Sequence, residues 1–133
     1  MSVLLDTHVL LWWKGDPARL SRLARRTLAR ELPVLVSPVS FWEIATLLRL
    51  GRVELDRDLY AWMSDLLAEE IDLAPLSAEA AADAGSWPGD EFPGDPADRL
   101  IYATARDLRV PLLSKDERMI ASAHARGDVS VIW

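Results

Sequence analysis

Apolar residues follow two alternating patterns along the 133-residue chain. Short apolar runs, typical of buried strands, alternate with stretches in which apolar positions recur every three or four residues, as on one face of a helix. The short runs predict strands at Val3–Leu5, Pro33–Val36, Ile71–Leu73, Val110–Leu113 and Val129–Ile132. The helical spacing predicts helices at Thr7–Lys14, Pro17–Arg30, Val39–Leu50, Asp58–Glu70, Ala78–Gly85, Pro96–Leu108 and Asp116–Arg126.

The alternation of strands and helices favours a parallel sheet, because parallel neighbours need crossover helices that cover both faces. We therefore predict an α/β fold in three layers, with a central, mostly parallel sheet of about five strands flanked by helices. The length suits one domain that spans residues 1–133.

One segment breaks the pattern. Residues 85–96 hold three glycines and three prolines, so we predict an irregular loop whose aromatic residues Trp87 and Phe92 are exposed. Trp87 is then a candidate for stacking on a nucleic-acid base. The remaining tryptophans on apolar stretches are expected in the core: Trp12, Trp13, Trp42 and Trp62.

Composition narrows the possible classes of protein. The absence of Cys excludes a disulfide framework, a thiolate nucleophile and a Cys-ligated zinc site. No apolar run approaches the ~20 residues of a membrane span, and the first residues lack the basic segment of a signal peptide. We expect a cytoplasmic protein without a membrane partner.

The charge is unevenly distributed. The net charge of −6 has the wrong sign for holding nucleic acid by bulk electrostatics, but residues 1–50 hold 7 basic and 4 acidic side chains. Four arginines share one side of the predicted helix at 17–30, namely Arg19, Arg22, Arg26 and Arg30. This face is a solvated surface, an RNA track or a protein contact.

Five acidic residues stand at structurally suggestive positions. Asp6 and Asp116 follow predicted strands, Asp95 and Asp98 flank Pro96 at a predicted helix start, and Glu43 shares a helix face with apolar residues. Taken singly, the aspartates suit helix capping and Glu43 suits the edge of an apolar stripe.

Taken together, the acids suggest a metal site. Residues that follow parallel strands emerge at one edge of the sheet, so Asp6 and Asp116 become neighbours if their strands pair, and Asp98 can lie alongside. Carboxylates this close repel one another unless a cation lies between them. A set of oxygen ligands without Cys selects a hard ion, Mg²⁺ or Mn²⁺.

Four segments carry a resemblance to a known family. Leu4–Trp13, Ser40–Ile44, Asp95–Ile101 and Leu113–Asp116 resemble the PIN-domain ribonucleases, and among them the VapC-type toxins of bacterial toxin–antitoxin pairs. The resemblance spans almost the whole chain and implies a PIN-like fold over residues 1–133 and metal-dependent endoribonuclease activity. It assigns catalysis to Asp6, Glu43, Asp98 and Asp116, with Asp6, Asp98 and Asp116 as ligands of Mg²⁺ or Mn²⁺.

The resemblance also assigns secondary positions. Thr7 and Ser114 match hydroxyl positions beside the metal, and Asp95 matches a secondary acid. Ala97 stands where many relatives carry a larger side chain. The basic residues near these motifs are candidates for contact with substrate phosphates: Arg99, Lys115 and Arg118.

The implied reaction is hydrolysis of RNA to 3′-hydroxyl and 5′-phosphate ends, with Glu43 positioning or deprotonating the attacking water. The implied partners are RNA, a second copy in a homodimer, and a small VapB-like antitoxin that blocks the acid pocket.

Two rival functions remain. In phosphotransferases of the haloacid-dehalogenase type, an Asp after the first strand is the nucleophile, but these enzymes usually carry a second Asp where this chain has His8. The other rival is an inert interaction module that keeps its acids as helix caps. His8 beside Asp6 also suggests a general base that needs no metal, although a packed histidine explains it as well.

Overall fold

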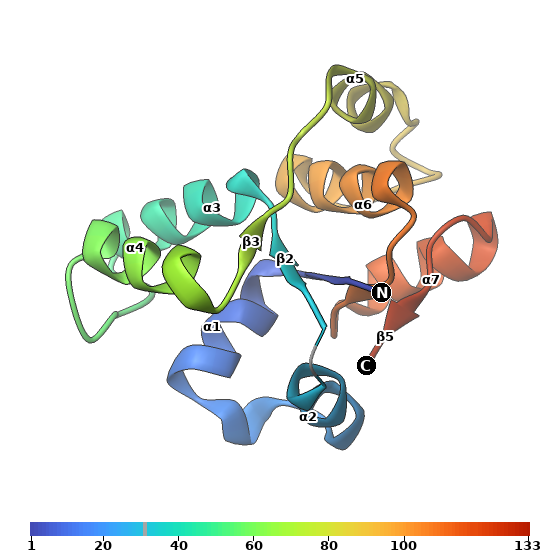
Figure 1. Cartoon of the computed structure of the whole chain (residues 1–133). Coiled ribbons are helices and arrows are strands. Elements are labelled where there is room, and N and C mark those ends of the chain that lie inside the picture. The colour runs from blue at the N-terminus through green and yellow to red at the C-terminus, as the bar shows by residue number, and fades with distance from the viewer. Residues whose placement is uncertain (31) are drawn as a thin grey trace.

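The computed structural model describes residues 1–30 and 32–133 and contains a central five-stranded sheet (Figure 1). All strands are parallel and lie in the order β3-β2-β1-β4-β5. They are β1 (Val3–Leu5), β2 (Val34–Val36), β3 (Asp72–Leu73), β4 (Leu112–Leu113) and β5 (Val131–Ile132). The predicted α/β class, the five parallel strands and the pairing of β1 with β4 are thus confirmed.

Helices cover both faces of this sheet. They are α1 (Thr7–Gly15), α2 (Arg22–Ala29), α3 (Pro38–Arg49), α4 (Leu59–Glu69), α5 (Ala78–Ser86), α6 (Pro96–Leu108) and α7 (Glu117–Arg126), with a short 3₁₀ helix η1 at Pro17–Arg19. No helix in the described ranges, 1–30 and 32–133, is long and apolar enough to cross a membrane.

The single helix predicted over Pro17–Arg30 is wrong. The chain is extended at Leu20 and Ser21, where Leu20 enters the core and the Ser21 hydroxyl accepts a hydrogen bond from the Ala24 amide to begin α2. Burial of Leu20 and capping by Ser21 outweigh continuous helical spacing. Arg19 therefore does not share a helix face with the other arginines.

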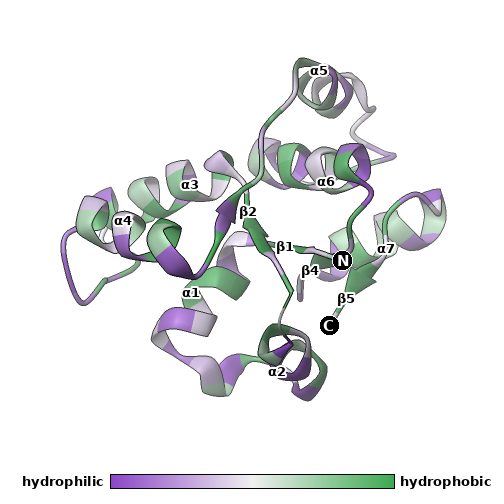
Figure 2. Ribbon diagram, viewed as in Figure 1, coloured by the Kyte–Doolittle hydropathy of each residue, from purple (hydrophilic) through white to green (hydrophobic). Residues whose placement is uncertain are grey.

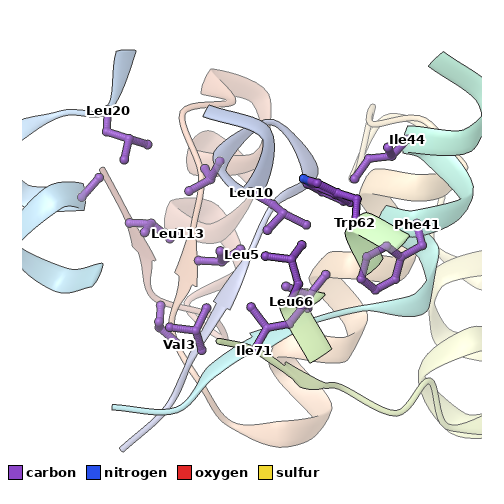
Figure 3. Close-up of a cluster of buried hydrophobic side chains, with 14 residues drawn as sticks. Val3, Leu5, Leu10, Leu20, Phe41, Ile44, Trp62, Leu66, Ile71 and Leu113 are labelled. Carbon is purple, nitrogen blue, oxygen red and sulfur yellow. The ribbon is translucent and has the colours of Figure 1, made fainter. Parts of the chain in front are cut away.

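Two apolar cores lie on opposite faces of the sheet because successive strand residues point to opposite sides. Val3 and Leu5 contribute to the first core, which α1, α3 and α4 cover with side chains such as Ile44 and Trp62 (Figure 3). Leu4 contributes to the second core beneath α6 and α7. In Figure 2 the strands are mostly apolar and polar residues gather on the outer faces of the helices.

The loop after α5 is irregular, as predicted, but its aromatic residues are not exposed. Phe92 is buried, and the half-buried Trp87 ring packs against Phe92 and Tyr102, with the Arg126 guanidinium 4.5 Å from its centroid. Trp87 thus packs within its own loop, and stacking of a base on its ring stays a prediction.

A second tryptophan also departs from its prediction. Trp62 is buried and Trp12 and Trp13 are half-buried, but Trp42 is 63% exposed on α3. Its neighbour Phe41 points into the first core instead. Adjacent helical residues lie about 100° apart on the wheel, so only one of them can face the core.

Candidate metal-dependent active site

The carboxyl edge of the sheet places Asp6 beside the end of β4. The Asp6 amide donates to the Leu113 carbonyl at 3.0 Å. The buried Asp6 carboxylate accepts hydrogen bonds from the Thr7 amide at 2.8 Å and the Ser114 hydroxyl at 2.7 Å. Ser114 Oγ also accepts from the Asp116 amide at 3.1 Å. One serine hydroxyl thus joins Asp6 to the segment that carries Asp116.

Asp98 reaches this edge from the first turn of α6. Asp95 caps that helix and accepts a hydrogen bond from the Asp98 amide at 2.9 Å. Gly94 permits the approach, since an added Cβ would lie 2.7 Å from Phe92 and 3.0 Å from the Asp98 Cβ. The Arg118 guanidinium lies 4.0 Å from Asp98 and 3.8 Å from Asp116, so these two carboxylates border the same side chain.

Glu43 enters from the third side, on α3. The Thr7 hydroxyl donates a hydrogen bond to Glu43 and lies 2.9 Å from the buried Ser40 Oγ. We call Asp6, Glu43, Asp98 and Asp116 the acid cluster. Ser40 was missed in the sequence, although its position one helical turn before Glu43 marks it as a polar residue on the same inward face.

The carboxylates of the acid cluster repel one another electrostatically. Burial, followed by the charges of Asp6, Asp95, Asp116 and Glu43, raises the pKa of Asp98 to about 7. The pKa of Glu43 is also raised, chiefly by burial, against the opposing effect of the Thr7 hydrogen bond. A carboxylate in the first turn of a helix is ordinarily favoured by the helix dipole, so the shift of Asp98 reflects crowding and burial that overcome the dipole.

This donor set suits a hard divalent cation. The four carboxyl groups offer only oxygen ligands, and a cation would relieve their repulsion. Within residues 1–30 and 32–133, however, no three acidic or imidazole side chains converge as a ready-made metal cage. To share one cation the carboxylates must draw closer or bind it through water.

His8 borders the cluster in a role unlike a general base. Its Nε2 accepts a hydrogen bond from the Lys115 amide at 3.0 Å, and its Nδ1 lies 3.6 Å from the Asp6 carboxylate. Burial lowers the pKa of His8, so the ring is neutral at pH 7. Because the basic nitrogen of the neutral ring already accepts a hydrogen bond from the backbone, His8 positions the loop at Lys115 beside Asp6.

The three predicted phosphate contacts differ in their structural roles. The Arg99 guanidinium donates to the carbonyls of Ala84 at 2.9 Å, Trp87 at 2.6 Å and Phe92 at 2.7 Å. These bonds give Arg99 a structural role in the loop before α6, and its contact with substrate stays a prediction. Lys115 and Arg118 are exposed at the rim of the acid cluster.

The arginine face does not border the acid cluster. Arg22, Arg26 and Arg30 are exposed on or just after α2. Helix α2 lies near the amino-terminal end of β2, whereas the acid cluster lies at the carboxyl ends of the strands (Figure 1). Arg19 lies apart from them, with its guanidinium carbon 4.3 Å from the centroid of the Trp12 ring.

Comparison with known proteins agrees with this architecture. The family profile of the PIN domain matches residues 3–125. The chain is 38% identical to ribonuclease VapC22 of Mycobacterium tuberculosis over 125 aligned residues. The alignment covers 94% of this chain and 95% of that protein.

Solved structures share the fold at low sequence identity. The structure of VapBC2 from Rickettsia felis bound to a promoter DNA fragment superposes with a TM-score of 0.68 at 12% identity, over 99% of this chain and 98% of the other. The structure of VapBC-1 from nontypeable Haemophilus influenzae superposes with a TM-score of 0.67 at 16% identity, over 99% of this chain and 97% of the other.

Proposed function

Because this chain belongs to the PIN-domain family, we propose that it is a divalent-metal-dependent endoribonuclease and the toxin of a toxin–antitoxin pair. Residues 1–133 then form a single PIN domain. The relative in Mycobacterium tuberculosis is named a ribonuclease and matches along nearly its whole length, which supports the same activity here.

The convergence of Asp6, Glu43, Asp98 and Asp116 at one edge of the sheet is the observation that carries this proposal, and the pKa of Asp98, raised to about 7 by burial and by the neighbouring acids, agrees with it. Helix capping accounts for Asp6, Asp95 and Asp116, because each side chain accepts a hydrogen bond from a backbone amide at the start of a helix. It does not account for Glu43 or Asp98, which are partly buried among like charges at a cost in stability. An inert module gains nothing from that cost, whereas a cation-binding site requires it.

In the proposed mechanism, Asp6, Asp98 and Asp116 hold the cation. A bound Mg²⁺ or Mn²⁺ supplies positive charge that stabilises the transition state and acidifies the attacking water. Glu43, fixed by the Thr7 hydroxyl, positions that water and takes its proton. Ser114 fixes the Asp6 carboxylate. In-line attack of the water oxygen on phosphorus would break the bond to the 3′ oxygen, which takes a proton from solvent and leaves as a 3′-hydroxyl, while the new oxygen remains on the 5′-phosphate.

The proposal includes partners that would restrain the enzyme in the cytoplasm. Solved structures with this fold include VapBC2 of Rickettsia felis, VapBC-1 of nontypeable Haemophilus influenzae and a toxin–antitoxin complex of Klebsiella pneumoniae. By analogy we infer a homodimer and a small VapB-like antitoxin that covers the acid cluster. The phosphotransferase alternative is not favoured, because His8, where a second Asp is expected, is held by the Lys115 amide.

The test is cleavage of cellular RNA by the purified chain, with sequencing of the 5′-phosphate ends. We expect cleavage with Mg²⁺ or Mn²⁺, none after exhaustive chelation, and a loss of at least about a hundredfold for Asp98→Asn. The matched control is Asp58→Asn, which makes the same change in an aspartate at the start of α4, outside the acid cluster. Full cleavage in EDTA, or by folded Asp98→Asn, would overturn the proposal.

A further inference from the structure

A hollow of about 320 Å³ opens directly beside the acid cluster. Its walls are formed by His8, Trp12, Lys115, Asp116 and Glu117. Asp116 belongs to both the hollow and the acid cluster, so the two adjoin.

The Trp12 ring is held in place at the wall of the hollow. Its centroid lies 4.9 Å from that of His8 and 5.9 Å from that of Trp133, and the Arg19 guanidinium carbon lies 4.3 Å from it. The indole is half-buried, so part of its surface remains available. A large aromatic ring fixed by its neighbours loses little conformational entropy when a ligand stacks on it.

Lys115 adds a positive charge to the same wall. Its ammonium lies 5.7 Å from the Trp12 centroid, and the Lys115 side chain is exposed. The Lys115 backbone is fixed by the hydrogen bond from its amide to His8 Nε2 at 3.0 Å. An aromatic face and an ammonium side by side are the two groups that bind single-stranded nucleic acid, by stacking on the base and by attraction to the phosphate.

We propose that this hollow is a nucleotide subsite in which the base next to the cleaved bond stacks on Trp12 and its phosphate binds Lys115. The inference rests on the proposed nuclease function and names how that site holds its substrate. Because stacking accepts any base, the subsite contributes affinity and register rather than recognition of one base.

The same helix supplies a matched control. Lys14 lies 3.7 Å from the Trp13 centroid, a second lysine–tryptophan pair. There the ammonium is bound by Glu70 at 2.6 Å, and neither Trp13 nor Lys14 lines the hollow. Trp13→Ala and Lys14→Gln therefore make the same changes in side chain as Trp12→Ala and Lys115→Gln, but outside the proposed subsite.

The test measures binding of a short fluorescent RNA that carries the mapped cleavage site, with Asp98→Asn as background to prevent cutting. A series of the same RNA replaces one base at a time with an abasic sugar. We expect Trp12→Ala to weaken binding of the intact RNA about tenfold, and one abasic position beside the cleaved bond to abolish that difference. Lys115→Gln should weaken binding and reduce its salt dependence, while Trp13→Ala and Lys14→Gln should match the background.

The outcomes separate this inference from the nuclease assignment. If the wild-type chain cleaves RNA but the Trp12→Ala penalty is equal for the intact RNA and for every abasic RNA, the effect is structural and the subsite is rejected. Trp12→Phe, which keeps an aromatic face, should retain most of the binding, and a loss equal to that of Trp12→Ala would also reject stacking. If the wild-type chain does not cleave RNA at all, the proposed function itself fails.

Discussion

Two acid-rich regions of this protein treat their carboxylates in opposite ways. On the far side of α6, Asp83 and Asp128 are matched by arginines: Arg106 lies 3.5 Å from Asp83 and 3.4 Å from Asp128, and Arg126 lies 3.3 Å from Asp128. We call these four residues, with Tyr102, the arginine-paired network. In the acid cluster the only nearby guanidinium within the described residues is that of the exposed Arg118, 3.8 to 4.0 Å away.

The paired carboxylates have a structural role, and the crowded carboxylates are the candidates for a chemical role. The arginine-paired network connects α5, α6 and the segment after α7, and the buried Tyr102 donates its hydroxyl to Asp128. The same chain thus satisfies its acids where they only hold helices together. The crowding of acids at the carboxyl edge of the sheet supports the proposed cation site.

The largest expected effect on stability comes from breaking the arginine-paired network. Asp128→Ala removes the partner of the buried Tyr102 hydroxyl and of two guanidinium groups. We expect the free energy of unfolding to fall by about 2–3 kcal/mol, measured by urea denaturation, with RNA cleavage per folded molecule unchanged. Asp83→Ala, which removes a more exposed acid, should cost less than about 1 kcal/mol. Equal losses for the two variants would contradict the network's dependence on the buried hydroxyl.

Neutralising Asp98 in the acid cluster should raise the free energy of unfolding at high pH, the opposite of the effect of Asp128→Ala. The pKa of Asp98 is about 7 in the folded chain, above its ordinary value of 3.8. The folded state therefore binds a proton more tightly than the unfolded state, and this contribution to stability is lost as the pH rises from about 4 to 7. In EDTA we expect Asp98→Asn to be more stable than wild type at pH 8, by on the order of 1–2 kcal/mol, but not at pH 4.

The measurement is urea denaturation of both proteins across this pH range, with Asp58→Asn as the control that keeps the wild-type pH dependence. If Asp98→Asn were less stable than wild type at pH 8, crowding of the acids would not be the origin of the raised pKa.

Much of the fold was predictable because local pattern and tertiary structure agree. The buried run Val3–Leu5 is a strand, and the residues that follow parallel strands do meet at one edge, which brought Asp6 and Asp116 together as expected. The break at Leu20 was not predictable from helical spacing, because it depends on a core that residues far along the chain complete.

The chemistry of individual side chains was less predictable. Arg99 occurs in the segment that resembles the PIN family, yet its guanidinium bonds to three loop carbonyls that only the folded loop brings together. The sequence predicts Trp12 in the core and Trp87 in an exposed loop, but both side chains are half-buried. Trp87 packs against Phe92 and Tyr102, and Trp12 borders a hollow. Contacts between distant segments, which no local pattern encodes, determine both outcomes.

The smallest expected effect tests how far the Thr7 hydroxyl limits the rise in the pKa of Glu43. Burial raises the pKa of Glu43, and the hydrogen bond from the Thr7 hydroxyl opposes that rise. Thr7→Val removes the donor but keeps the backbone amide that binds Asp6, so the pKa of Glu43 should rise further. Because Glu43 must be ionised to take a proton, the acidic limb of the rate profile should move to higher pH, with a loss of about two- to fivefold at pH 6 and little loss at pH 9. Thr7→Ser restores the hydroxyl and should restore the wild-type profile. A uniform loss at every pH would assign Thr7 to the geometry of the acid cluster and not to the ionisation of Glu43.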